Sequence, residues 1–296
     1  MTRKTARDFH PEVLKLFDQY VHGVIGRRDF LTAAAKYAVA GITAGGLLEA
    51  LSPQFAQAQQ VAADDKRIRT GTVTFGSPQG YGTVRAYLAV PAGAKGKLPT
   101  VLVVHENRGL NPHIEDIARR LALAKFIALA PDALFPLGGY PGNEDAAREL
   151  FQKLDQDKTH ADVLAAAAYL KTLPVGNGKV GVVGFCYGGG IVNFLATRIP
   201  DLAAAVAFYG AQPGAEEAAK IKAPLLLHYA GADDRINTGW PAYERALKAA
   251  GVSYQTHIYP GVQHGFNNDT TPRYDEAAAH LAWQRTVDFL NAHLRA

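Results

Sequence analysis

The sequence predicts an α/β protein, with a doubly wound, mostly parallel sheet and helices on both faces. Short apolar runs alternate with longer segments of helical periodicity, and the runs end at Gly, Pro or Asp. Most of the runs are apolar throughout, as is typical of strands that are covered on both faces. The chain has 296 residues, of which 48% are hydrophobic. One large core is therefore expected, without support from disulfides or metals.

The first two predicted strands, 71–75 and 84–90, form an antiparallel hairpin at one edge of the sheet, because their residues alternate around Gly-rich turns. The parallel strands are expected at 101–105, 126–130, 180–184, 204–209, 225–229 and 255–259. Helical spacing predicts helices over 114–124, 144–173, 189–199, 241–250 and 274–294. Asn143 and Thr238 are predicted N-caps, while Gly251 and the glycines at 176 and 178 are predicted to follow the ends of helices. Functional groups should then lie at the carboxyl ends of the strands.

Composition excludes several classes of protein. A single cysteine rules out an internal disulfide and a multi-cysteine zinc site. The formal net charge of +4 is spread along the chain without a basic arm or stripe, which argues against nucleic acid as a partner. No H-E-x-x-H motif or comparable ligand spacing is present. We therefore expect neither a metal nor a cofactor.

The N-terminal segment contains Gly26-Arg27-Arg28-Asp29-Phe30-Leu31-Thr32, followed by a run of small apolar residues. This pattern resembles a twin-arginine export signal. The apolar core, Tyr37 to Leu48, has only twelve residues, whereas a membrane span needs about twenty. Ala56-Gln57-Ala58 matches a signal-peptidase site and predicts a mature start near Gln59.

The expected division is thus a signal segment over 1–58 and a single domain over 59–296. The implied location is the periplasm or beyond, with the twin-arginine export machinery as a partner and no stable membrane insertion after processing. Two alternatives remain at this stage. The segment could be an amphipathic helix with an arginine pair by chance, or an uncleaved anchor.

A candidate nucleophile lies in Gly184-Phe185-Cys186-Tyr187-Gly188, between a buried strand and a helix. The pattern is G-x-S-x-G, the nucleophile elbow, with Cys in place of Ser. The two glycines are needed because side chains there would strike the neighbouring strand or helix. The helix N-terminus would favour a thiolate at Cys186. The alternatives are a buried packing cysteine and a phosphate-binding turn, although the glycines do not fit G-x-G-x-x-G.

An elbow requires an acid after a later strand and a histidine after the next. Asp233 and Asp234 follow the strand at 225–229, and His264 follows the strand at 255–259. Asp233 is preferred because it comes directly after Gly-Ala. Alternatively, the acid pair caps a helix and His264 is a structural loop residue. The remaining histidines, apart from His105, are expected to be ordinary surface or packing residues.

Across residues 70–296 the chain resembles the dienelactone hydrolase family of α/β-hydrolases, also called carboxymethylenebutenolidases. The matching pieces are His105 to Gly109, Ala130-Pro131-Asp132, Gly178 to Gly190, Phe208-Tyr209-Gly210, the Asp233 turn and His264-Gly265-Phe266. The resemblance implies the α/β-hydrolase fold and a Cys186, His264 and Asp233 triad. It also implies that Glu106 contacts the resting thiol, and that the backbone N–H groups of Tyr187 and Asn107 bind the oxyanion. Otherwise Glu106 would be a loop residue paired with Arg108.

The resemblance is weaker around the substrate. Family members that cleave dienelactones hold a carboxylate with two arginines, and Glu144 and Asn268 stand at those positions here. The candidate substrate-binding residues are Arg108, Tyr140, Arg148, Arg235 and Trp240, with Arg273, Phe135 and Tyr187 also near the predicted loops. The loop 134–143, rich in Gly and Pro, is the predicted lid.

The sequence therefore predicts a hydrolase that opens a lactone or cleaves a small carboxylic ester through an acyl-enzyme. The partner is a small-molecule ester or lactone. A thioesterase or acyltransferase with the same triad is one alternative, and a non-catalytic ligand-binding protein on a hydrolase scaffold is another.

Overall fold

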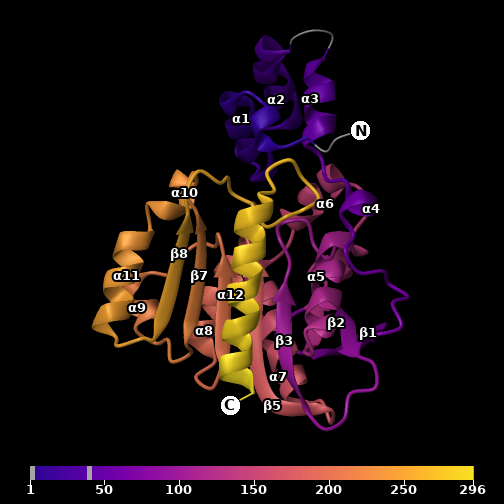
Figure 1. The fold of residues 1–296 in the computed structure, drawn as a ribbon, viewed down its shortest axis with the longest axis vertical. Helices are drawn as coiled ribbons and strands as arrows, with labels where there is room; N and C mark the ends of the chain where they lie inside the picture. The colour runs from indigo at the N-terminus through magenta and orange to yellow at the C-terminus, as the bar shows by residue number, and fades with distance from the viewer. Residues whose placement is uncertain (1–3, 39–41, 296) are drawn as a thin grey trace.

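The fold is built on one eight-stranded sheet (Figure 1). A computed structural model describes residues 4–38 and 42–295. The strand order is β1-β2-β4-β3-β5-β6-β7-β8, and β2 alone runs against its neighbours. The strands are β1 (Ile68–Ser77), β2 (Gly82–Pro91), β3 (Leu98–Val104), β4 (Ile127–Pro131), β5 (Gly176–Phe185), β6 (Ala204–Phe208), β7 (Leu225–Ala230) and β8 (Tyr254–Tyr259). The predicted doubly wound sheet and its antiparallel edge hairpin are confirmed.

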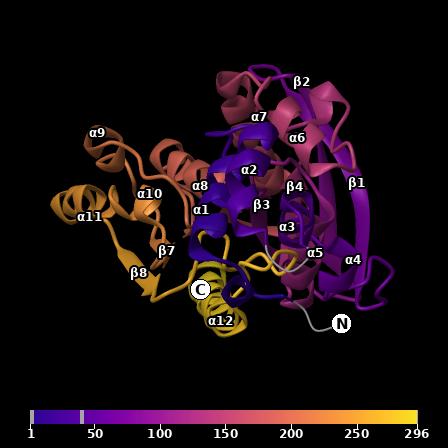
Figure 2. The ribbon, with the colours of Figure 1, turned by 90° about the horizontal axis from the view of Figure 1, so that it is seen from above.

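Helices cover both faces of the sheet, as the view from above shows (Figure 2). One face packs against α5 (Pro112–Leu123) and α12 (Glu276–Leu294), and the other packs against α7 (Gln156–Thr172), α8 (Tyr187–Arg198) and α11 (Trp240–Ala249). Shorter elements complete the loops: η3 (Phe135–Leu137), α6 (Glu144–Phe151), α9 (Ala215–Ala218) and α10 (Asp234–Asn237). Each face has its own apolar core, which explains why the parallel strands are apolar throughout.

Two of the predicted element boundaries are wrong. The segment 144–173 forms two helices, α6 and α7, because the side chain of Asp155 accepts hydrogen bonds from the N–H groups of Asp157 and Lys158 and starts a new helix. Asn143 caps α6, as predicted. Thr238 instead ends α10, where its hydroxyl donates to the carbonyl of Asp234. The glycines at 176 and 178 lie at the start of β5.

Residues 4–38 and 42–58 fold into a helical unit, which we call the N-terminal cap. It contains α1 (Pro11–Val21), α2 (Arg27–Ala34), α3 (Ala44–Leu51) and α4 (Phe55–Ala58), with 3₁₀ turns η1 (Ala6–Asp8) and η2 (Ala35–Tyr37). Phe17, Tyr20 and Phe30 form the centre of its separate apolar core. Part of the predicted apolar run, 39–41, lies outside the described residues. Within 4–38 and 42–295, no helix is long and apolar enough to cross a membrane.

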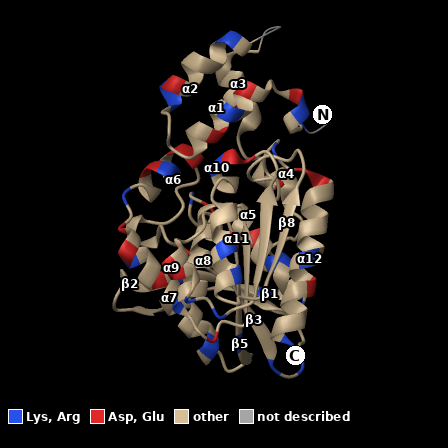
Figure 3. Cartoon of the chain, turned by 90° about the vertical axis from the view of Figure 1, so that its left-hand side faces the viewer, with Lys and Arg blue, Asp and Glu red and all other residues tan. Residues whose placement is uncertain are grey.

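The cap lies over the end of the molecule at which the parallel strands finish (Figure 1). Arg27 forms an ion pair with Asp145 at 2.7 Å, and the guanidinium of Arg148 donates to the carbonyl of Tyr20 at 2.8 Å. Figure 3 shows both signs of charge scattered over the helices and loops, including those where cap and sheet domain meet. After the cap, the N–H groups of Gln60 and Val61 donate to Asp116 on α5. The chain is thus anchored on both sides of the predicted cleavage position.

Phe30→Ala should loosen the cap, because Phe30 is fully buried in the cap's own core. Removal of a buried phenylalanine typically costs about 3–5 kcal/mol of unfolding free energy. Hydrogen exchange should rise in α1 to α3 while the sheet strands stay protected. Val24→Ala, at a side chain that is 67% exposed, is the control and should change stability by less than about 0.5 kcal/mol. Equal protection of the cap in both variants would contradict this assignment.

Candidate active site

The turn from β5 into α8 holds Cys186 in a strained backbone conformation. Cys186 has φ 55° and ψ −113°, a region that non-glycine residues rarely adopt. A Cβ on Gly184 would lie 2.2 Å from the carbonyl oxygen of Gly188, and a Cβ on Gly188 would lie 2.3 Å from that of Val104. The predicted need for glycine on both sides of the cysteine is therefore confirmed, and the turn has the geometry of a nucleophile elbow.

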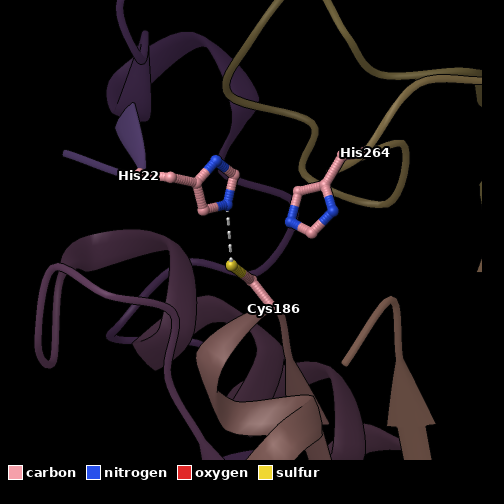
Figure 4. A group of neighbouring side chains, drawn as sticks. All are labelled: His22, Cys186 and His264. Atoms are coloured by element: carbon pink, nitrogen blue, oxygen red, sulfur yellow. Dashed lines mark hydrogen bonds between the residues drawn. The ribbon is translucent and has the colours of Figure 1, made fainter. Parts of the chain in front are cut away.

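The predicted acid and base lie beside this turn. Asp233 and His264 follow β7 and β8, and the carboxylate of Asp233 is 2.5 Å from Nδ1 of His264. Both side chains are buried, and Asp233 also accepts from the N–H of Ile236 at the start of α10. Nδ1 of His264 thus donates to Asp233. Its Nε2 atom is buried without a hydrogen-bond partner, lies within 4.8 Å of the sulfur and points toward it (Figure 4).

The sulfur has a second histidine neighbour, His22, from the end of α1 in the cap (Figure 4). Nε2 of His22 lies 3.4 Å from Sγ of Cys186. Nδ1 of His22 lies 2.7 Å from the carbonyl oxygen of Asp18 and 3.2 Å from its carboxylate. The two imidazole rings meet edge to face, with centroids 4.8 Å apart.

The expectation that His22 is an ordinary surface or packing residue is therefore wrong. Asp18 lies four residues before His22, and this spacing on a helix predicts a contact between the two side chains but no contact outside the helix. No pattern in the sequence indicates that this helix end reaches a thiol more than 160 residues away.

These contacts favour an ionised thiol. Burial alone would raise the pKa of Cys186, but the positive charges of His264 and His22 and the hydrogen bond from His22 outweigh burial and lower the pKa to about 6. Burial opposes charge on both imidazoles as well. The Cys186 thiolate, together with Asp18 for His22 and Asp233 for His264, raises the pKa of each histidine, that of His22 to about 10. A thiolate flanked by an imidazolium is thus favoured near neutral pH.

Glu106 lies on the wall of the cavity beside Cys186, where its carboxylate accepts a hydrogen bond from the side chain of Asn268 at 2.8 Å. The side chain that the structure places in hydrogen-bond contact with the sulfur is His22, a residue that the sequence interpretation did not consider for this position. The N–H of Tyr187 is the first of α8 and has no partner within the helix. Asn107, the other predicted oxyanion donor, lines the cavities on both sides of Cys186.

The predicted substrate-binding arginines contact the cap. Arg108 donates to the carbonyls of Asn107 and Val21, both at 3.0 Å, and Arg148 donates to that of Tyr20. Nη2 of Arg235 lies 3.0 Å from Nε2 of His22 and 3.3 Å from Nδ1 of His264. Arg273, from the same neighbourhood, is 3.3 Å from the carboxylate of Asp18. The end of α1 therefore occupies the arginines that a substrate carboxylate would need.

The predicted aromatic residues are divided between the site and the surrounding packing. Tyr140, in the predicted lid loop, donates to Glu144 at 2.8 Å and lines the cavity on the Glu106 side. Trp240 instead packs in an aromatic cluster, with Tyr229, Tyr243 and Tyr254. Phe135 lies beneath the guanidinium of Arg85.

Two cavities meet at Cys186. The larger, of about 500 Å³, extends along α8 and is lined by apolar side chains that include Ile191, Phe194 and Ile236. The smaller, of about 310 Å³, lies under the cap among Glu106, Arg108 and Glu144. The sulfur is thus reached from an apolar side and from a polar side that the cap closes.

Cys186, His22 and His264 are also the one group with metal-ligand potential among the residues that the structure describes. Their ligand atoms lie within 4.8 Å of one another. The guanidinium of Arg235, however, lies against the nitrogen of His22 that a cation would use. A divalent cation at that position would meet this charge with two of its own, whereas a proton adds only one, so the group is better suited to proton transfer than to metal binding.

Comparisons with known proteins identify the family of the chain. Residues 84–294 match the model of the dienelactone hydrolase family, and residues 1–38 match a model described as YqhI-like. A Methylorubrum extorquens protein, provisionally named carboxymethylenebutenolidase, is 32% identical over 277 residues, which are 88% of this chain and 94% of that protein. YghX of Escherichia coli, provisionally described as a hydrolase fragment, is 55% identical over 114 residues, which are 38% of this chain and 97% of YghX.

Among solved structures, a provisionally named dienelactone hydrolase from Klebsiella pneumoniae is similar at a TM-score of 0.65 with 31% identity, covering 75% of this chain and 98% of that one. The chain combines this sheet and strand order with the family's sequence pattern over most of its length. It belongs to the dienelactone hydrolase family and is a hydrolase of the carboxymethylenebutenolidase type.

Proposed function

We propose that the protein hydrolyses a carboxylic ester or lactone with Cys186 as nucleophile, through an acyl-enzyme. The observation that carries the proposal is the sulfur on a strained elbow with the buried Asp233 and His264 pair within reach. Binding alone would not require a thiol of lowered pKa next to a histidine whose free nitrogen faces it.

The proposed reaction has two stages. The thiolate of Cys186 attacks the acyl carbon, and the N–H groups of Tyr187 and Asn107 receive the oxyanion. The bond to the leaving oxygen then breaks, and that oxygen takes a proton from an imidazolium beside the sulfur and leaves as an alcohol. Water then attacks the thioester while Nε2 of His264 accepts its proton, and the acid product leaves as the thiolate is restored. Asp233 holds His264 in the tautomer that this step needs, with the proton on Nδ1.

The cavities support an uncharged ester with an apolar acyl group as substrate. Contacts with α1 use terminal N–H groups of Arg108 and Arg148, which leaves fewer donors there for a substrate carboxylate. The cavity along α8 is mainly apolar and has room for an acyl group larger than acetyl. We assign the acyl group to this cavity.

We also propose that residues 1–58 direct export by the twin-arginine route, as their pattern predicts. The folded cap is compatible with this route, which carries proteins already folded. The arginine pair lies in α2, where Arg27 contacts Asp145. A signal function and a contact with the sheet domain are therefore combined in the same residues.

Cys186→Ala should abolish ester hydrolysis. Loss of the nucleophile from an acyl-transfer site costs on the order of 10⁴ to 10⁶ in kcat. The measurement is steady-state hydrolysis of aryl esters and lactones by the full chain, with thermal unfolding to establish that the variant is folded. Undiminished hydrolysis by Cys186→Ala would refute the proposed mechanism. Tight ligand binding without turnover in the wild type would favour a binding protein.

Gly190→Leu should shorten the acyl chain that the enzyme accepts. A Cβ on Gly190 meets its nearest neighbours at an ordinary 3.7 Å, and the residue lines the cavity along α8. The side chain would therefore fill space without moving the backbone. We expect kcat/KM for octanoyl esters to fall at least about tenfold, which corresponds to about 1.4 kcal/mol, and acetyl esters in the same variant to change little. Equal losses of kcat/KM for octanoyl and acetyl esters would mean that the acyl group binds outside this cavity.

Replacement of Arg27 and Arg28 by lysines should block export in a host with a twin-arginine pathway, leaving the protein in the cytoplasm. The control is Asp145→Asn, which removes the same ion pair with Arg27 but keeps both arginines. Fractionation reports the location of the protein, and intact mass reports whether residues 1–58 are retained or removed after Ala58. Cytoplasmic wild type, or equal loss of export in the control, would contradict a signal function for the pair.

A further inference from the structure

The active site contains two aspartate–histidine pairs directed at one sulfur. Asp233 and His264 come from loops after β7 and β8, whereas Asp18 and His22 come from α1 in the cap. Figure 4 shows the two rings on different sides of Cys186. The proposed mechanism uses only the first pair, although the second is in direct hydrogen-bond contact with the nucleophile.

The hydrogen bonds assign different protonation states to the two rings. Nδ1 of His264 faces the Asp233 carboxylate, and its Nε2 has no partner, so the neutral ring carries its lone pair on Nε2. Burial and the charge of His22 lower the pKa of His264, against the thiolate and Asp233, which raise it, so a charged His22 favours the neutral form of His264. Nδ1 of His22 faces two acceptors of Asp18, and its Nε2 faces the sulfur. Against a thiolate, both nitrogens of His22 act as donors, which is the imidazolium form.

The charged groups around His22 are balanced. Asp18 and the thiolate of Cys186 favour its proton. The guanidinium of Arg235, 3.0 Å from Nε2 of His22, disfavours the proton, but this side chain is 43% exposed and also lies 3.9 Å from the carboxylate of Asp18. Arg273 contacts that carboxylate as well. Asp18 therefore links the imidazole to both guanidinium groups.

We propose that His22 is a second catalytic histidine, supplied by the N-terminal cap, which holds the thiolate and donates the proton that the leaving group needs. This role rests on the proposed function of Cys186 as nucleophile, and it applies to the chain that keeps residues 1–58, as the full chain tested below does. General acid and general base catalysis are then separate: His22 is the general acid of acylation, and His264 is the general base of deacylation.

The steps balance as follows. The Sγ–C bond forms, the bond from the acyl carbon to the leaving oxygen breaks, and that oxygen takes the proton from Nε2 of His22 to leave as an alcohol. Water then adds to the thioester and gives a proton to Nε2 of His264, and the C–S bond breaks to release the acid and the thiolate. Transfer of that proton from His264 to His22, directly or through solvent, restores the starting state.

The test measures leaving-group dependence in the full chain. His22→Gln should lower kcat/KM for an alkyl ester by about 10² to 10⁴-fold, the usual contribution of a general acid. For the nitrophenyl ester of the same acid, the loss should be at least about tenfold smaller, because nitrophenolate leaves without a proton donor. A structural role would lower both alike. Equal losses, or no loss, would overturn the proposal.

A second readout does not depend on turnover. The rate of thiol alkylation against pH should show a midpoint near pH 6 in the wild type, as the lowered pKa of Cys186 implies. His22→Gln should move the midpoint above about pH 7, toward the ordinary cysteine value of about 8.5. Asp18→Asn should move it in the same direction by a smaller amount. An unchanged midpoint in His22→Gln would overturn the role of His22.

His10→Gln is the matched control. His10 caps the opposite end of α1, where it accepts from the N–H of Glu12 and stacks on Tyr37. Both readouts should stay at wild-type values in this variant. If the proposed function fails, turnover is absent from the wild type or persists in Cys186→Ala. If only this inference fails, turnover still depends on Cys186, but His22→Gln does not make it sensitive to the leaving group.

Discussion

The close contact between the β5–α8 turn and its neighbours is the constraint on which the site depends. Gly184 and Gly188 touch backbone atoms at distances that leave no room for a side chain, and Cys186 between them takes a positive φ. The surrounding sheet holds this strain in place, since β5 lies between β3 and β6. The sulfur is thereby presented at the end of the strands, next to the first turn of α8. The parallel strand order then brings Asp233 and His264 to the same edge.

The cap changes which groups contact the arginines and the sulfur at this edge. Without the cap, the guanidinium groups of Arg108, Arg148 and Arg273 would lose their partners on α1. The end of α1 supplies carbonyl oxygens and the Asp18 carboxylate to these groups, and its carbonyls carry the negative end of the helix dipole. One helix end therefore binds these guanidinium groups and places an imidazole on the sulfur.

The local elements could be predicted because their signals are local. Strands buried on both faces have to be apolar, and the steric demands of the elbow require glycines at fixed positions, so both were visible in sequence. The helix break at Asp155 was missed because the apolar spacing continues across it, while a buried Leu154 and a capping aspartate start a new helix. Thr238 was misassigned because a short helix, α10, precedes α11 and uses that residue as its end.

By itself, the sequence determined the α/β architecture, the elbow and the chain order of Cys186, Asp233 and His264, because each rests on short-range periodicity, steric fit or a known order of loops. Only the tertiary structure decided that His22 lies on the sulfur, that Glu106 pairs with Asn268, and that the candidate arginines face the cap rather than open solvent. Contacts of this kind join segments far apart in the chain. Their existence depends on how two separately packed units dock, and such docking leaves no periodic pattern in the residues that make it.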